Sequence, residues 1–149
     1  MKHPPCLWIA FGGVLCLAAL AAGGCGGGSV KPHGTLMMNG QPYKPESGET
    51  LQITFAGEGE SGKSISAVAS VNPDGTFTVS GSTNTGIPPG KYRIMVQSTQ
   101  YSKGGPMNMA DKFQGKYSDA TKTPLTCEIT SANQPIIIDV GKGTASTGT

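Results

Sequence analysis

Apolar residues alternate with polar ones along much of this chain, and that period of two limits the fold more than any other feature. The stretch "TLQITFA" places Leu51, Ile53 and Phe55 on one side of an extended strand. A helix would need apolar positions three and four residues apart, and no long stretch of the sequence has that spacing. The alternation therefore predicts strands, which we expect at residues 34–38, 50–56, 65–71, 76–80, 91–98, 125–130 and 135–140.

Turn-forming residues separate these stretches. Asn39-Gly40 is a strong hairpin dipeptide, and "NPDG" at 72–75 joins a proline that fixes φ to a glycine that can take positive φ. "IPPG" at 87–90 and "SANQ" at 131–134 separate later strands. Short strands with such turns between them indicate an all-β fold, which we expect to be a seven-strand antiparallel sandwich.

The inward positions of these strands define the expected core of a domain at residues 34–140, which is long enough to bury one sandwich core. One irregular segment, Thr99–Pro124, interrupts the pattern and is expected to be a loop that crosses between the sheets. Cys127 alternates in phase with the neighbouring apolar residues and is expected to be a buried thiol. The predicted core consists of Leu36, Leu51, Ile53, Phe55, Ala69, Val71, Phe77, Val79, Tyr92, Ile94, Val96, Leu125, Ile129, Ile136 and Ile138.

The N-terminus has the layout of a secretion signal. Lys2 provides a positive start, an uncharged apolar stretch follows, and small residues lead up to Cys25. The sequence "AAGGC" resembles the lipobox of bacterial lipoproteins, in which the cysteine is acylated and the chain is cut just before it; it departs from the pattern at Ala22, where leucine is usual. The resemblance implies a lipoprotein signal peptide at 1–24 and lipidation of Cys25. An uncleaved membrane anchor and an ordinary signal peptide are the alternatives.

Small and polar residues flank the expected domain. The glycine-rich stretch at 25–33 has the composition of a flexible tether, and residues 141–149, "GKGTASTGT", are expected to be a flexible tail. Cys6 and Cys16 would leave with the signal peptide, and an acylated Cys25 cannot pair. No disulfide is therefore expected.

The stretch "GEGESGKS" at 57–64 matches the phosphate-binding pattern G-x-x-x-x-G-K-[ST] at every fixed position. In such a loop a helix begins at the Lys-Ser end, and its backbone N–H groups point at the phosphates. Here Lys63 and Ser64 lead into an alternating stretch, which predicts a strand. Asp139, which ends the apolar "IIID", fits the exit of a central strand as well as a magnesium ligand. We interpret the motif as a polar hairpin loop and keep a nucleotide-binding enzyme as a remote alternative.

Few residues suit catalysis or metal binding. His3 lies in the signal peptide and His33 in the tether, so a Ser-His-Asp triad would depend on one mobile histidine. Tetrahedral zinc sites need several Cys or His residues, which this chain lacks. The formal net charge is only +2 and there is no basic run, so nothing indicates nucleic-acid binding. We expect no enzymatic activity, no cofactor and no metal.

The order of several short phrases resembles one group of bacterial proteins. "VNPDGTFTV", "GIPPGKYRIMV", "KYSD" and "NQPIIIDV" follow one another as they do in small lipoproteins of planctomycete-type bacteria that carry a carboxypeptidase-regulatory-like domain. The resemblance covers residues 34–140 and implies a transthyretin-like (prealbumin-like) fold, a seven-strand Greek-key sandwich, in a noncatalytic accessory domain. The stretch "GESGKSISAVAS" departs from the family's usual loop, so the loop chemistry does not carry over.

The resemblance also implies a role for "IPPGKY". In Greek-key sandwiches a tyrosine at a sheet corner donates its hydroxyl to an upstream backbone group. Tyr92 is the candidate here, and Gly90 would permit the tight corner. The alternative is that Tyr92 is a half-buried aromatic residue of a strand.

These observations lead to one expected function and two alternatives. The expectation is a non-enzymatic, lipid-anchored module of the bacterial cell envelope, on the periplasmic or surface side of a membrane. It would contact membrane lipid through acylated Cys25, and an envelope protein or a glycan through its loops or an edge strand. An accessory subunit of an envelope transport or surface-assembly system, with Thr99–Pro124 as the contact loop, is the alternative. The nucleotide-binding enzyme is the remote one.

Overall fold

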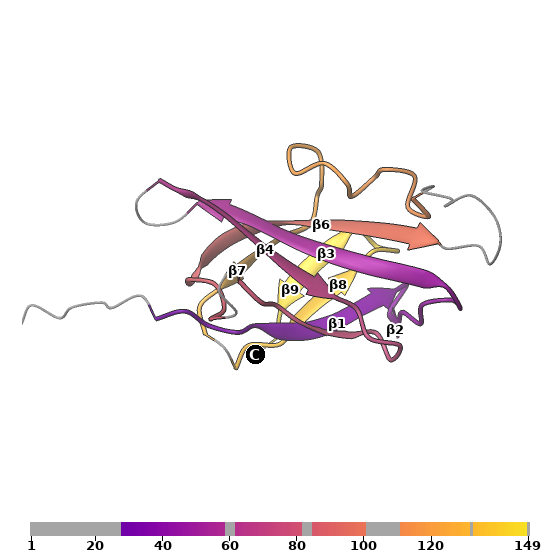
Figure 1. Cartoon of the computed structure of the whole chain (residues 1–149), viewed down its shortest axis with the longest axis horizontal. Helices are drawn as coiled ribbons and strands as arrows, with labels where there is room; N and C mark the ends of the chain where they lie inside the picture. The colour runs from indigo at the N-terminus through magenta and orange to yellow at the C-terminus, as the bar shows by residue number, and fades with distance from the viewer. Residues whose placement is uncertain (1–27, 59–61, 82–84, 101–110, 132, 149) are drawn as a thin grey trace, which may run out of the picture.

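The computed structural model describes residues 28–58, 62–81, 85–100, 111–131 and 133–148, so Cys25 and the predicted signal peptide lie outside the described residues. The described residues form nine strands and no α-helix (Figure 1). No helix long and apolar enough to cross a membrane is present among them. The strands are β1 (His33–Met38), β2 (Gln41–Pro42), β3 (Glu49–Glu58), β4 (Ser64–Ser70), β5 (Thr76–Thr78), β6 (Gly90–Gln100), β7 (Thr126–Ile129), β8 (Ile136–Asp139) and β9 (Thr144–Thr147).

The strands belong to two sheets. One has the order β2-β1-β8-β9, with β5 also paired to β1, and the other has the order β4-β3-β6-β7. The second sheet is antiparallel throughout, and its two long central strands are in register from Glu49 beside Gln100 to Gly57 beside Tyr92. The chain passes from one sheet to the other after β2, β4, β5 and β7. The prediction of an all-β fold is therefore confirmed, and two sheets enclose the core as in a β-sandwich.

The core lies between the two sheets, where the period-two pattern placed it. Every residue predicted for the core is buried except Val71, which is half-buried. Phe55 and Phe77, which come from different sheets, approach with ring centroids 6.2 Å apart. Cys127 is also buried, as predicted. The buried residues that the prediction omitted include Tyr43, Ala67, Ile87, Tyr117 and Val140.

One pair of strands contradicts the prediction of a purely antiparallel sandwich. β1 and β8 run parallel, with Gly34 beside Ile136 and Met37 beside Asp139. No hairpin joins these two strands, because the chain visits the other sheet twice between them, so their direction is not set by a short turn. Gly34 permits their close approach, since a Cβ at this position would lie 2.0 Å from the carbonyl oxygen of Ile136.

The predicted strand count and the predicted flexible tail are also wrong. The described residues contain nine strands rather than seven, and β9 lies in the segment that was expected to be a flexible tail. β9 joins through its backbone, with Thr144 beside Asp139 and Thr147 beside Ile136, so its small polar residues gave no alternation to detect. At the other end, His33 belongs to β1 and lies opposite Thr78, although the sequence placed it in the tether.

The irregular segment was predicted to begin at Thr99, but Thr99 and Gln100 belong to β6. Its other described residues, 111–124, hydrogen-bond to β6 and contain turns rather than strands. Tyr117 is buried, accepts a hydrogen bond from the Val96 N–H through its carbonyl oxygen, and donates its hydroxyl to the carbonyl oxygen of Val140. Thr123 donates its hydroxyl to the carbonyl oxygen of Ile94 at 2.8 Å. The segment joins β6 to β7 of the same sheet, so the prediction of a loop that crosses between the sheets is wrong. Tyr117 instead bonds the segment to the residue that follows β8 in the other sheet.

Candidate functional site: a groove beside the N-terminal entry

The phosphate-loop motif occurs in a β-hairpin. Glu58 ends β3 and lies opposite Ser64, which begins β4, so the motif's Lys-Ser end leads into a strand. Residues 59–61 lie outside the described residues, whereas Lys63 is described and exposed. A strand lacks the aligned, unpaired N–H groups with which a helix N-terminus holds phosphate. The motif therefore does not have the local geometry that gives the pattern its function.

Asp139, which the nucleotide-binding alternative would use as a magnesium ligand, instead bonds to the protein backbone. Its Oδ2 accepts a hydrogen bond from the Gly40 N–H at 2.7 Å, and its Oδ1 accepts three from the N–H groups of Asn39, Gly141 and Lys142 at 3.0 Å each. The residue is 5% exposed. Burial raises the pKa of the carboxyl, but the N–H donors and the charge of Lys142 outweigh it and lower the pKa below its ordinary value. The carboxylate binds two backbone turns to each other.

Tyr92 makes the hydrogen bond expected of a corner tyrosine. Its hydroxyl donates to the carbonyl oxygen of Pro88, four positions upstream, at 2.6 Å. The side chain is inside the sandwich, edge-on to Phe55, and burial raises the pKa of its phenol. Gly90 begins β6 with φ of 158°, a value that side-chain-bearing residues rarely adopt, although a Cβ there would have space. The corner thus fixes the start of β6, where the groove begins.

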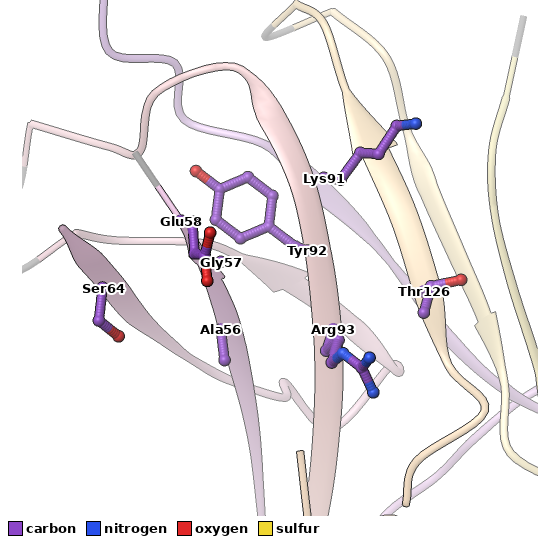
Figure 2. Close-up of a pocket in the computed structure, with 8 residues that line it drawn as sticks. All are labelled: Ala56, Gly57, Glu58, Ser64, Lys91, Tyr92, Arg93 and Thr126. Carbon is purple, nitrogen blue, oxygen red and sulfur yellow. The ribbon is translucent and has the colours of Figure 1, made fainter. Parts of the chain in front are cut away.

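A groove of about 630 Å³ crosses β3, β6 and β7 near this corner. Ala56, Arg93 and Thr126 lie side by side on the three strands, and Figure 2 shows Arg93 between the other two. The small residues of β3 make the hollow, because neither Ala56 nor Gly57 fills the space between the longer side chains around it. The lining consists of Ala56, Gly57, Glu58, Ser64, Lys91, Tyr92, Arg93 and Thr126.

Two exposed cations dominate the charge of the groove. The Arg93 guanidinium donates to the carbonyl oxygen of Ala120 at 3.1 Å, which orients it and leaves its other N–H groups for a ligand. Lys91 reaches Glu128 only at 4.0 Å, and its side chain is 84% exposed, so this ion pair is weak. Glu58 is the carboxylate in the lining. A groove of this size and character suits a small anionic group.

At the opposite end of the second sheet, Glu49 is the centre of a polar cluster. Its side chain is 1% exposed, and its Oε1 accepts hydrogen bonds from the hydroxyls of Tyr43 and Ser98 at 2.8 Å each. Its Oε2 accepts the Glu46 N–H at 2.9 Å and lies 3.5 Å from Lys112 Nζ. Burial raises the pKa of Glu49, but these donors outweigh burial and lower it. The hydrogen bond to Glu46 and the others around it raise the pKa of Lys112, so both groups are charged at neutral pH.

This cluster is satisfied by the protein itself. Each oxygen of Glu49 has two donors, and Lys112 also bonds Glu46 Oε1 at 2.7 Å. The cluster therefore fastens the segment that begins at Asp111 to the start of β3.

The thiol of Cys127 is not a good candidate for a reactive nucleophile. Burial raises its pKa to about 11, which keeps it protonated at neutral pH.

Comparison with known proteins gave no relative: no family model, no curated protein and no solved structure matches the chain. Within the residues that the structure describes, no group of three or more His, Cys, Asp or Glu side chains could hold a metal ion. The candidate site is therefore defined by geometry alone.

The sequence contained signals for part of what it failed to predict. Glu49 shares the inward phase of Leu51 and Ile53, and Ser98 shares that of Val96, so both polar residues could have been placed at the rim of the core. No pattern in the sequence indicated the groove. It depends on which residues of β3, β6 and β7 become neighbours, and the pairing of these strands spans much of the chain.

Proposed function

We propose that this chain is a non-enzymatic, lipid-anchored module of a bacterial cell envelope, held to a membrane through acylated Cys25 on the periplasmic or surface side. The resemblance to planctomycete-type lipoproteins with a carboxypeptidase-regulatory-like domain supports the proposal. The repeated passage of the chain between two sheets suits the transthyretin-like Greek-key sandwich that this family implies. We therefore also propose that the chain belongs to this family of lipoproteins.

The observation that carries the proposal is the position at which the folded part begins. Val30 exchanges two backbone hydrogen bonds with Ile87, at 2.8 and 2.7 Å, only five residues after Cys25. A membrane-spanning anchor would have to lie in the uncharged stretch that precedes Val30. The second half of that stretch is rich in glycine, which is a poor membrane-spanning residue. A lipid on Cys25 needs no spanning segment, so it fits this short connection better.

The partner in this proposal is an envelope protein or a glycan that binds at the edge of the second sheet. β4 is an edge strand there, and its pairing on the side away from β3 is an isolated bridge from Val68 to Ser80; Val71, just after the strand, bridges to Phe77. Val68 is 40% exposed on this strand. An incompletely paired edge strand offers N–H and C=O groups to an added strand or to another hydrogen-bonding ligand.

Cell fractionation tests the anchor. We expect Cys25→Ser to move the protein from the membrane fraction to the soluble fraction and to abolish incorporation of a labelled fatty acid. Cys127→Ser is the matched control, since Cys127 is buried in the sandwich, and it should leave both readouts unchanged. A Cys25→Ser protein that stays tightly in the membrane would instead support the uncleaved anchor.

Photo-crosslinking in intact cells tests the partner surface. A crosslinking amino acid at Val68 should give a defined adduct, whereas one at Ile137 should not. Both side chains are 40% exposed, but Ile137 belongs to β8 in the other sheet, so the two positions differ in location rather than accessibility. Equal adducts from both positions, or none from Val68, would count against β4 as the contact edge.

A further inference from the structure

The described chain begins beside the groove. Gly28 is the first described residue and follows Cys25 by three residues, so an extended connection between them spans at most about 11 Å. Ser29 lines a hollow together with Ser64, and Ser64 also lines the groove. Figure 1 shows the start of the described chain and the turn end of the β3–β4 hairpin at the same end of the molecule. A lipid on Cys25 would therefore hold this end of the sandwich against the membrane.

The same end carries an excess of positive charge. Among the described residues, Lys91 and Arg93 are exposed in the groove and Lys31 and Lys63 on the segments beside it, against two exposed carboxylates, Glu58 in the lining and Glu128 beside Lys91. Charges this close to a membrane lie within about one Debye length of its surface, where anionic headgroups attract basic residues. The short tether also raises the effective concentration of the surface, so weak contacts are enough to orient the domain.

We propose that the groove end of the sandwich lies on the membrane and that Lys91 and Arg93 bind the phosphates of anionic lipid headgroups. The inference rests on the proposed lipid anchor at Cys25. The groove holds two cations and one carboxylate, and Arg93 is already oriented by the carbonyl oxygen of Ala120. In this orientation β1 points away from the membrane, and the turn at Asn39-Gly40 and the start of β3 are presented to the surroundings.

A lipid headgroup fits the groove better than a glycan does. Sugar-binding surfaces use exposed aromatic rings as stacking platforms, and the aromatic residue in this lining, Tyr92, is 3% exposed. The hydroxyls of Ser64 and Thr126 beside the two cations can accompany a phosphate, since hydroxyl and guanidinium donors both bind phosphate oxygens.

Depth-dependent quenching of the full-length, lipidated protein in vesicles tests the inference. A fluorophore is placed at Ser66→Cys, beside the groove end, or at Gln41→Cys on β2, at the other end; both positions are exposed. The vesicles contain phosphatidylcholine alone or phosphatidylcholine with phosphatidylglycerol, and a quencher is attached to a headgroup. We expect several-fold stronger quenching at position 66 than at position 41 in the anionic vesicles, and a loss of the difference at high salt.

Two double variants separate the groove from general charge. Lys91→Gln with Arg93→Gln should abolish the difference between the two reporters. Lys44→Gln with Lys116→Gln removes the same charge from exposed positions outside the groove and should leave the difference intact. Equal quenching at both reporters, or a difference that survives in phosphatidylcholine alone or in the groove variant, overturns the inference while the anchor stands. Failure of the unmodified protein to enter the vesicle fraction overturns the anchor and the inference together.

Discussion

Asp139 Oδ2 accepts a hydrogen bond from the backbone nitrogen of Gly40 at 2.7 Å, although the two residues are 99 positions apart in the chain. Asn39 and Gly40 both have positive φ in the turn between β1 and β2, and Asp139 ends the parallel strand beside β1. The carboxylate therefore joins the first turn of the sandwich to the end of β8. Glu49 plays a similar part where the segment from Asp111 meets β3.

The first prediction concerns this carboxylate. Asp139→Asn should lower the free energy of unfolding by about 2 kcal/mol at pH 7, because the amide replaces one acceptor oxygen with an N–H₂ group that faces N–H donors. The pKa of Asp139 is lowered in the folded state, so its contribution is complete above the unfolded value of about 3.9 and is lost as pH falls through the folded pKa. The difference between the two proteins should therefore shrink below about pH 4.

Denaturant unfolding at pH 7 and at pH 3, followed by circular dichroism, measures this difference. Glu128→Gln is the matched control, since Glu128 is an exposed carboxylate on β7, and it should change the unfolding free energy by less than about 0.5 kcal/mol at either pH. A constant cost of Asp139→Asn across the acid range would mean that the charge of Asp139 does not matter.

The second prediction concerns the corner at the start of β6. Tyr92→Phe keeps the ring against Phe55 but removes the hydroxyl that bonds to Pro88, so it should cost about 1 kcal/mol of unfolding free energy. Tyr92→Ala should cost about 3–5 kcal/mol, since the ring is buried. Equilibrium unfolding of the two variants measures both terms. If Tyr92→Phe is as stable as the unchanged protein, the hydroxyl contributes nothing to the corner.

The third prediction concerns the phosphate-loop motif. Lys63 is exposed in the hairpin between β3 and β4, so Lys63→Ala should change the unfolding free energy by less than about 0.5 kcal/mol. The unchanged protein should give no saturable heat with magnesium ATP in isothermal titration calorimetry, because Ser64 begins a strand rather than a helix. Saturable binding that Lys63→Ala abolishes would revive the nucleotide-binding alternative.

The sequence was sufficient for the inward side of each strand, because alternation is a local property. Leu51, Ile53 and Phe55 show this, since their burial follows from the period of two alone. The sequence was insufficient for predicting strand pairs that depend on the tertiary structure. β9 pairs through backbone groups that any sequence has, and the parallel pairing of β1 with β8 depends on how the chain returns from the other sheet.

The same distinction between local and long-range features applies to the residues of the candidate site. Tyr92 could be placed because its hydrogen bond reaches only four positions upstream and recurs at corners of this kind. Arg93 and Thr126 could not, because Arg93 comes to lie between Ala56 and Thr126 only when β6 is paired on both of its sides. Tyr117 was missed because it lies in a segment of turns, where no periodicity reports that a side chain is buried.

The last prediction compares two adjacent residues of β5. Phe77 is 1% exposed and packs against Phe55 across the core, whereas Thr78 is exposed, because successive side chains of a strand point to opposite sides. Phe77→Ala should therefore lower the free energy of unfolding by about 3–5 kcal/mol, from lost burial and from the cavity left behind. Thr78→Ala should cost less than about 0.5 kcal/mol, since it removes only exposed atoms. The single tryptophan lies at position 8, within the predicted signal peptide, so far-ultraviolet circular dichroism or tyrosine fluorescence would follow unfolding of the mature chain. Similar costs at the two positions would mean that β5 does not present Phe77 to the core.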